Sequence, residues 1–144
     1  ALRFAIEGHA ELAAVAGIAP AMKFTSKAMP LIPLLHGVNT FVKWASPLEG
    51  AKTFELNDSE LPEINYRHMP VQAVYQLTQI RDELAERLPE LKIPTLIVQG
   101  SEDPVIDAKG AHWIHEQLGT EDKDLCIIPS NRHSIIYENI SKSS

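Results

Sequence analysis

The sequence predicts an α/β fold with a parallel sheet, and three observations in its second half support this fold class. Residues 95–99 form a short apolar, β-branched run that ends at Gly100, which is typical of a strand buried on both faces. Residues 125–128 form a second such run, which ends at Pro129. A helical pattern separates the two runs. A strand–helix–strand unit of this length predicts parallel strands with a right-handed crossover.

The helix between these strands has both of its ends marked. Asp107 can cap its start and Gly119 can end it, while Ala111, Ile114 and Leu118 provide one apolar side. That side predicts packing of the helix on the sheet.

The start of the chain predicts a helix end and then a third strand. Residues 2–11 indicate the end of an amphipathic helix, with Gly8 near its end. Residues 12–19, LAAVAGIA, are apolar, and their length does not separate a strand from a helix. We interpret them as a third parallel, buried strand, because Gly17 and Pro20 interrupt the run.

Residues 20–69 differ from the rest, because six of the ten prolines fall from Pro20 to Pro70. Prolines this frequent predict short helices and turns. The first half of the segment is apolar and the second half is polar and loop-like. A lid over an apolar pocket and a surface excursion that packs on the body are both consistent with this pattern.

Residues 71–88 predict an amphipathic helix that covers the sheet, with Pro70 in its first turn and Pro89 after its end. Its apolar side is formed by Val71, Val74, Leu77, Leu84 and Leu88. Residues 134–140 indicate the start of a last helix.

Composition limits the classes of partner and compartment. The chain has 144 residues, which suits one domain, and its net charge of −6 argues against a nucleic-acid surface. Prolines and charges interrupt every apolar run, so no stable membrane insertion is expected. The one cysteine, Cys126, is expected to be a small buried hydrophobic residue. The sequence leaves the compartment open, with the cytoplasm as the expectation.

Glycine and histidine positions argue against several kinds of site. No two glycines are closer than nine residues, so GxGxxG, P-loop and GxSxG motifs are absent from the sequence. His112 and His115 stand three apart beside Glu116, but a solvated helix face is favoured over a metal site. The sequence gives no partner for His9, His36 or His68, and neither a metal nor another cofactor is expected.

Asp103 and His133 form the candidate catalytic pair. Asp103 follows the strand at 95–99 and His133 follows the strand at 125–128. If the two strands are neighbours, their carboxyl ends lie about 4.8 Å apart. Ligands bind at the carboxyl ends of the strands in open α/β sheets. A carboxylate beside an imidazole fixes the tautomer of a catalytic base. Two ordinary turn residues are the alternative.

The motifs around this pair resemble those of a known family. IPTLIVQGSEDPVID, the strand LCIIP and SNRHSII are similar to the carboxyl-terminal part of an α/β-hydrolase, above all to lysophospholipase and monoacylglycerol lipase-like esterases. The resemblance implies that Asp103, in the turn from Gly100 to Pro104, is the acid of a triad, and that His133 is its histidine.

The opening ALRFAIEGHAELAAVAGIAPAM is similar to the helix that follows the nucleophile of this family and to its sixth strand. The resemblance implies a GxSxG a few residues before Ala1 and a cap at residues 20–69. Residues 1–144 would then be the carboxyl-terminal part of the domain, with the sixth, seventh and eighth strands in parallel and helices beside them. A homodimer through the exposed edge of the sixth strand, or pairing with the missing amino-terminal half, is the expectation.

The resemblance implies a serine hydrolase of acyl esters, to which this chain supplies the acid and the base but not the nucleophile. The fragment alone is expected to be inactive. The residues expected to bind the acyl chain are Met29, Leu31, Leu35, Phe41 and Trp44. The alternatives are an acyltransferase or an aspartate-nucleophile hydrolase of the same fold, and a non-catalytic interaction domain.

Overall fold

The computed structural model describes residues 1–25, 31–34, 36–38, 54–56, 68–133 and 135. The chain divides into two compact units, the first made of residues 1–25 and 81–144 and the second of residues 26–80. The long helix α3, Val71–Arg87, contributes residues to both units. The last helix predicted at residues 134–140 lies outside the described residues, apart from residue 135.

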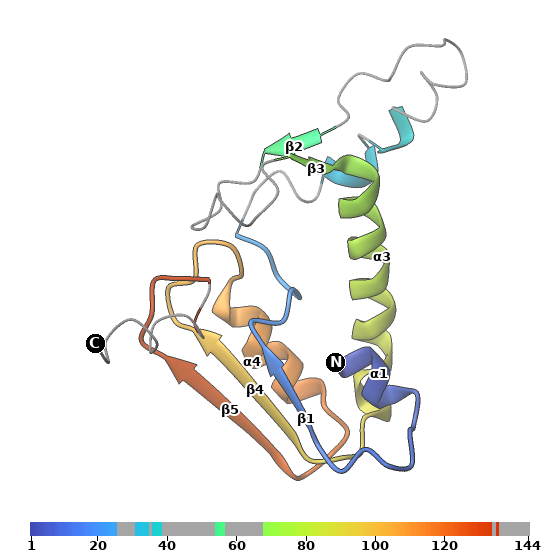
Figure 1. The fold of residues 1–144 in the computed structure, drawn as a ribbon, viewed down its shortest axis with the longest axis vertical. Helices are drawn as coiled ribbons and strands as arrows, with labels where there is room; N and C mark the ends of the chain where they lie inside the picture. Colours follow the sequence, from blue (N-terminus) through green and yellow to red (C-terminus); the bar gives the residue numbers. More distant parts are fainter. Residues whose placement is uncertain (26–30, 35, 39–53, 57–67, 134, 136–144) are drawn as a thin grey trace. The chain divides into compact units, whose positions relative to one another are not determined.

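The first unit contains a parallel sheet of three strands in the order β1-β4-β5 (Figure 1). Strand β1 is Val15–Ile18, β4 is Thr95–Gly100 and β5 is Lys123–Ile128. The three predicted parallel strands are therefore confirmed, although β1 is shorter than residues 12–19. Strand β1 lies at one edge of this described sheet. The homodimer, or the pairing with an amino-terminal half, that is expected at this edge stays a prediction.

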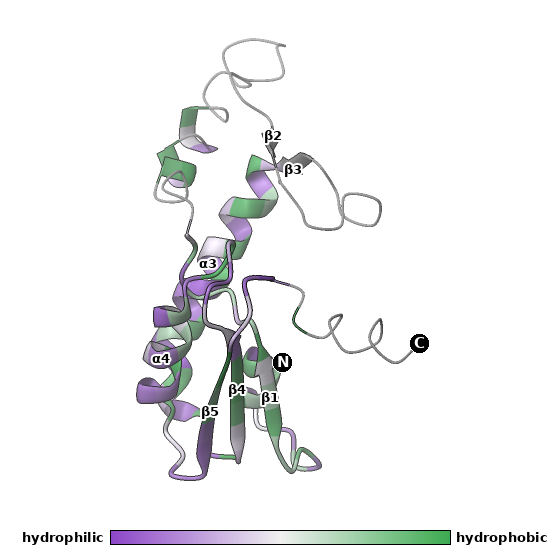
Figure 2. Ribbon diagram, turned by 90° about the vertical axis from the view of Figure 1, so that its left-hand side faces the viewer, coloured by the Kyte–Doolittle hydropathy of each residue, from purple (hydrophilic) through white to green (hydrophobic). Residues whose placement is uncertain are grey.

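Two helices pack on one face of this sheet. Helix α1 is Leu2–Ile6 and helix α4 is Ala108–Gln117. Helix α4 lies behind the strands in Figure 1 and to one side of the sheet when the sheet is seen edge-on in Figure 2. The buried core joins α1, α4, strand β4 and the 3-10 helix η2, Leu88–Glu90; its members are Leu2, Ala5, Leu88, Leu91, Ile97, Ala111, Ile114 and Leu118.

The structure confirms the helix between the last two strands. The Asp107 side chain caps α4 by accepting a hydrogen bond from the Lys109 amide at 2.9 Å. Ala111, Ile114 and Leu118 are buried, as the apolar spacing predicts. The cap and the apolar side together fix where α4 begins and how it turns towards the sheet.

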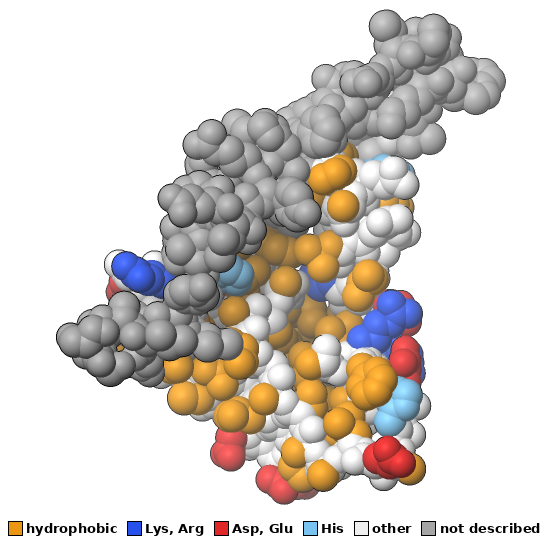
Figure 3. Space-filling model, in the orientation of Figure 1, with side chains coloured by type: hydrophobic (Ala, Val, Ile, Leu, Met, Phe, Trp, Pro, Cys, Tyr) orange, Lys and Arg blue, Asp and Glu red, His pale blue; other side chains and the backbone are white. Residues whose placement is uncertain are grey.

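The opposite face of the sheet shows two wrong predictions about burial. Leu96 is 39% exposed, so β4 is not buried on both faces, and Cys126 is exposed rather than buried. Successive side chains of a strand alternate between faces, and α1 and α4 pack on the face that carries Ile97. Figure 3 shows hydrophobic side chains gathered where the strands of this unit face the viewer.

Helix α1 ends earlier than residue 11, at Ile6, because Gly8 adopts a positive φ of 76° that an α-helix cannot continue. The chain then turns, and His9 stacks on Phe4 with ring centroids 3.8 Å apart. The sequence did not reveal this partner of His9.

In the second unit, residues 32–34 and 36–38 are helical, and strands β2, Phe54–Leu56, and β3, His68–Pro70, pair antiparallel. The ring of His36 stacks on that of Tyr75 at 4.2 Å, so His36 also has a partner that the sequence did not reveal. Among the described residues of the second unit, the buried ones are Ile32, Val71, Val74 and Thr78.

Helix α3 begins and ends as predicted, within one residue, but its buried side differs from the apolar pattern. Leu77 is exposed, whereas Thr78 is buried. The buried Thr78 hydroxyl still has a hydrogen-bond partner within the helix, because it donates to the Tyr75 carbonyl at 2.7 Å. In the first unit, Leu84 of α3 packs against the core. No helix among the described residues is long and apolar enough to cross a membrane.

Candidate active site

Asp103 lies in the turn that follows strand β4, and its side chain is fully buried. Its Oδ1 accepts hydrogen bonds from the Val105 and Ile106 amides, at 2.8 and 2.9 Å. A short carboxylate can satisfy the amides of a turn in this way, which explains why an aspartate fits this position. The same contacts fix the direction of the second oxygen, Oδ2.

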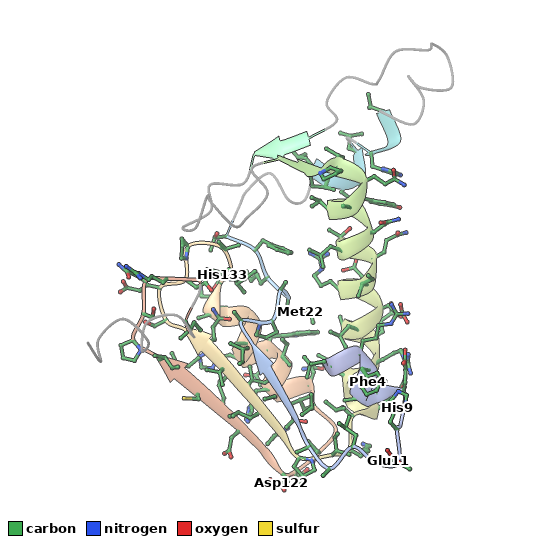
Figure 4. The ribbon with its side chains drawn as sticks, viewed as in Figure 1. Phe4, His9, Glu11, Met22, Asp122 and His133 are labelled. Atoms are coloured by element: carbon green, nitrogen blue, oxygen red, sulfur yellow. The ribbon has the colours of Figure 1, made fainter. Side chains whose placement is uncertain are left out.

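His133 lies in the turn that follows strand β5, and backbone contacts join the two turns. The Ser101 amide donates to the Ile128 carbonyl at 2.9 Å, and the Glu102 amide donates to the Ser130 carbonyl at 3.0 Å. Gly100 allows this approach, since a Cβ there would lie 3.3 Å from the Ser130 carbonyl oxygen. In Figure 4 His133 lies beyond the tips of β4 and β5, the end of the sheet where both strands finish.

The two side chains meet: His133 Nδ1 lies 2.8 Å from Asp103 Oδ2, across 30 residues of sequence. The contact is the one expected from neighbouring parallel strands, and it places the two side chains within hydrogen-bond reach of each other. With its Nδ1 proton donated to the carboxylate, neutral imidazole carries its lone pair on Nε2. The Asp103 side chain is buried, whereas that of His133 is 40% exposed.

A third side chain belongs to this site and was missed by the sequence analysis. Gln99, the fifth residue of β4, is fully buried, and its Nε2 donates to Asp103 Oδ2 at 3.0 Å. The available signal was a single side-chain amide in a mostly apolar strand, four residues before the acid.

The charge of Asp103 is stabilised by its surroundings. Burial raises the pKa of its carboxyl group, but hydrogen bonds from the Ile106 amide, the His133 side chain and the Val105 amide outweigh burial and hold the pKa below its ordinary value. The ionised carboxylate is thus favoured in the folded state.

We expect Asp103 to make folding stability depend on pH. Because its folded pKa is lower than its unfolded pKa, its contribution is fully present above the unfolded value and is lost as pH falls through the folded value. Chemical denaturation of the wild type and of Asp103→Asn, measured from neutral to acidic pH, should show a shallower acid slope for the variant. Identical slopes would show that Asp103 has no such linkage.

The residues expected to bind the acyl chain belong to the second unit, and the structure describes one of them. Leu31 is 55% exposed, and Met29, Leu35, Phe41 and Trp44 lie outside the described residues. On α4, His115 Nε2 lies 3.4 Å from the Lys123 carbonyl oxygen. Within the part of the chain that the structure describes, no three His, Cys, Asp or Glu side chains are grouped to hold a metal ion.

The chain matches the model of a known family over almost its whole length. The family model described as "Serine aminopeptidase, S33" matches residues 1–140. No curated protein is matched by this sequence.

Solved structures share the fold. A structure of the metagenome-derived lipolytic enzymes LipS and LipT is 21% identical, with a TM-score of 0.70, over 92% of this chain and 51% of that one. A monoacylglycerol lipase from Paleococcus ferrophilus is 16% identical, with a TM-score of 0.68, over 94% and 56%. A monoglyceride lipase from Saccharomyces cerevisiae is 19% identical, with a TM-score of 0.66, over 94% and 50%. The chain therefore has part of the α/β-hydrolase fold and spans about half the length of these structures.

Proposed function

Because the chain belongs to the serine aminopeptidase S33 family of α/β-hydrolases, we propose that it supplies the acid and the base of a serine hydrolase that cleaves acyl esters. In this proposal the nucleophilic serine comes from polypeptide outside these 144 residues. The polypeptide that carries both parts is called the longer protein below.

The observation that carries the proposal is the 2.8 Å contact between His133 Nδ1 and Asp103 Oδ2, made by a buried carboxylate and a partly exposed imidazole. His133 Nε2 takes the proton of the serine hydroxyl as the serine oxygen attacks the ester carbonyl. The imidazolium then returns this proton to the departing alcohol, and water releases the acid in a second, equivalent cycle. Asp103 orients the imidazole and stabilises its charged form throughout.

An ester is proposed as the substrate, although the family description names an aminopeptidase. Support comes from the three similar structures, whose titles name lipolytic enzymes or lipases. The apolar composition of residues 29–44 also suits an acyl chain. Residues 20–69 are proposed to form the cap that holds this chain. The partner is therefore a small acyl ester.

The test compares an ester with an amide of similar size. The longer protein is assayed on p-nitrophenyl butyrate and on alanine p-nitroanilide, with the 144-residue chain alone as the control. We expect kcat/KM at least about 100-fold higher on the ester, and no turnover by the chain alone, which lacks the nucleophile and the oxyanion donors. Faster cleavage of the anilide would assign the site to peptides instead, and turnover of neither substrate would reject the proposal.

A further inference from the structure

We infer that Gln99 is a positioning residue that holds Asp103 in the orientation His133 requires. The structural part of this inference stands on contacts within the chain, and its consequence for turnover rests on the proposed function. Gln99 does not touch the reacting atoms in this scheme; it acts through Asp103.

The orientation of the Gln99 amide is fixed by its neighbours. Its Nε2 lies 3.0 Å from Asp103 Oδ2 and 3.3 Å from the Gly100 carbonyl oxygen, and both of these atoms are acceptors. Turning the amide over would place its oxygen against two acceptors, so only the observed orientation makes hydrogen bonds. Gln99 is therefore a donor to the carboxylate.

The other end of the amide shows that this donation has a cost. Gln99 Oε1 is buried and has no hydrogen-bond partner among the described residues. A buried acceptor without a partner is unfavourable, and an apolar side chain of the same length would avoid the loss. The glutamine is therefore explained by its N–H group, which donates to the Asp103 carboxylate.

Among the described residues, four donors bond to the Asp103 carboxylate, two on each oxygen. Oδ1 accepts from the Val105 and Ile106 amides, and Oδ2 accepts from Gln99 and His133. Three of these four donors belong to β4 and its turn, so they hold the carboxylate independently of the histidine. Without Gln99, His133 would be the one hydrogen-bond donor to Oδ2 among the described residues, and His133 is the group that Asp103 has to orient.

Two variants of matched shape test this role. Gln99→Met keeps the length and volume of the side chain and removes the donor. Gln99→Glu keeps the shape and replaces the donor by a carboxylate that repels Asp103. Gln117→Met, on the exposed face of α4, is the control for the substitution itself.

The first readout is made on the 144-residue chain by NMR, without any substrate. The proton between His133 Nδ1 and Asp103 should give a downfield ¹H signal, which Asp103→Asn removes. We expect the signal to exchange faster with solvent in Gln99→Met and to be lost in Gln99→Glu. Gln99→Met should melt within about 4 °C of the wild type, because the buried oxygen disappears together with the lost bond.

The second readout is turnover of p-nitrophenyl butyrate by the longer protein. We expect kcat to fall about tenfold in Gln99→Met and about 100-fold in Gln99→Glu, with KM unchanged, because misorientation affects the chemical step. Gln117→Met should match the wild type in both readouts.

The outcomes separate this inference from the proposed function. A signal that depends on Gln99 in a protein without esterase activity would reject the function and keep the positioning role. An active enzyme in which Gln99→Met changes neither the signal nor kcat would overturn the positioning role. A wild-type chain without the downfield signal would also overturn it, since there would be no Asp103–His133 hydrogen bond to position.

Discussion

Replacing His133 by alanine in the longer protein is expected to lower kcat for p-nitrophenyl butyrate by at least about 10⁴-fold. His133 is the only group in the proposed scheme that moves a proton, and alanine leaves the serine hydroxyl without a base. In that scheme, Nδ1 holds the imidazole against the buried Asp103 and Nε2 transfers the proton. The measurement is steady-state hydrolysis followed at 400 nm or a nearby wavelength.

The matched control for this variant is His112→Ala, which removes a histidine from the exposed face of α4. It should retain wild-type kcat and KM. His133→Ala should also keep the wild-type far-UV circular dichroism, because the side chain is partly exposed. Retention of more than about one tenth of the wild-type kcat by a folded His133→Ala would remove His133 from the mechanism.

Gly119→Ala is expected to destabilise the chain by about 3 kcal/mol, roughly 10 °C in melting temperature. A Cβ at residue 119 would lie 1.9 Å from the Pro89 carbonyl oxygen and 2.7 Å from its carbonyl carbon. These are backbone atoms of η2, next to the buried Leu88, so they cannot move aside as a flexible side chain would. The Gly119 amide also donates to the Leu88 carbonyl at 3.3 Å, which any shift would strain.

Gly37→Ala is the control for this substitution, because a Cβ at residue 37 would meet none of the described residues within 4 Å. It should change the free energy of unfolding by less than about 0.5 kcal/mol. Thermal unfolding followed by circular dichroism compares the two variants. Equal melting temperatures would mean that η2 and the end of α4 do not approach each other as closely as the structure places them.

The segment from β4 to His133 could be predicted because its signals are local. Each signal can be recognised from a few neighbouring residues. The signals are an apolar run ended by a glycine, an aspartate that caps a helix, and apolar residues at helical spacing. Parallel topology then places the residues after both strands at one end of the sheet, which is how Asp103 and His133 come together.

The features that were missed depend on contacts between distant parts of the chain. Gln99 carries the one side-chain amide of β4, and its contact with the acid becomes visible only when this amide is seen beside Asp103. Whether Leu96 and Cys126 are buried depends on which face the helices cover, and the strand pattern does not specify this. Gly119 was expected to end α4 by its backbone freedom, whereas the structure gives it a steric reason, the closeness of Pro89.

The most direct test is a crystal structure of the longer protein after reaction with an alkyl phosphonate, which labels an activated serine. The labelled oxygen is expected within hydrogen-bond distance, about 2.6–3.2 Å, of His133 Nε2, while Nδ1 stays bonded to Asp103. A label on a serine far from His133, or an imidazole turned away from Asp103 in the labelled protein, would contradict the assignment of these two residues as the acid and the base.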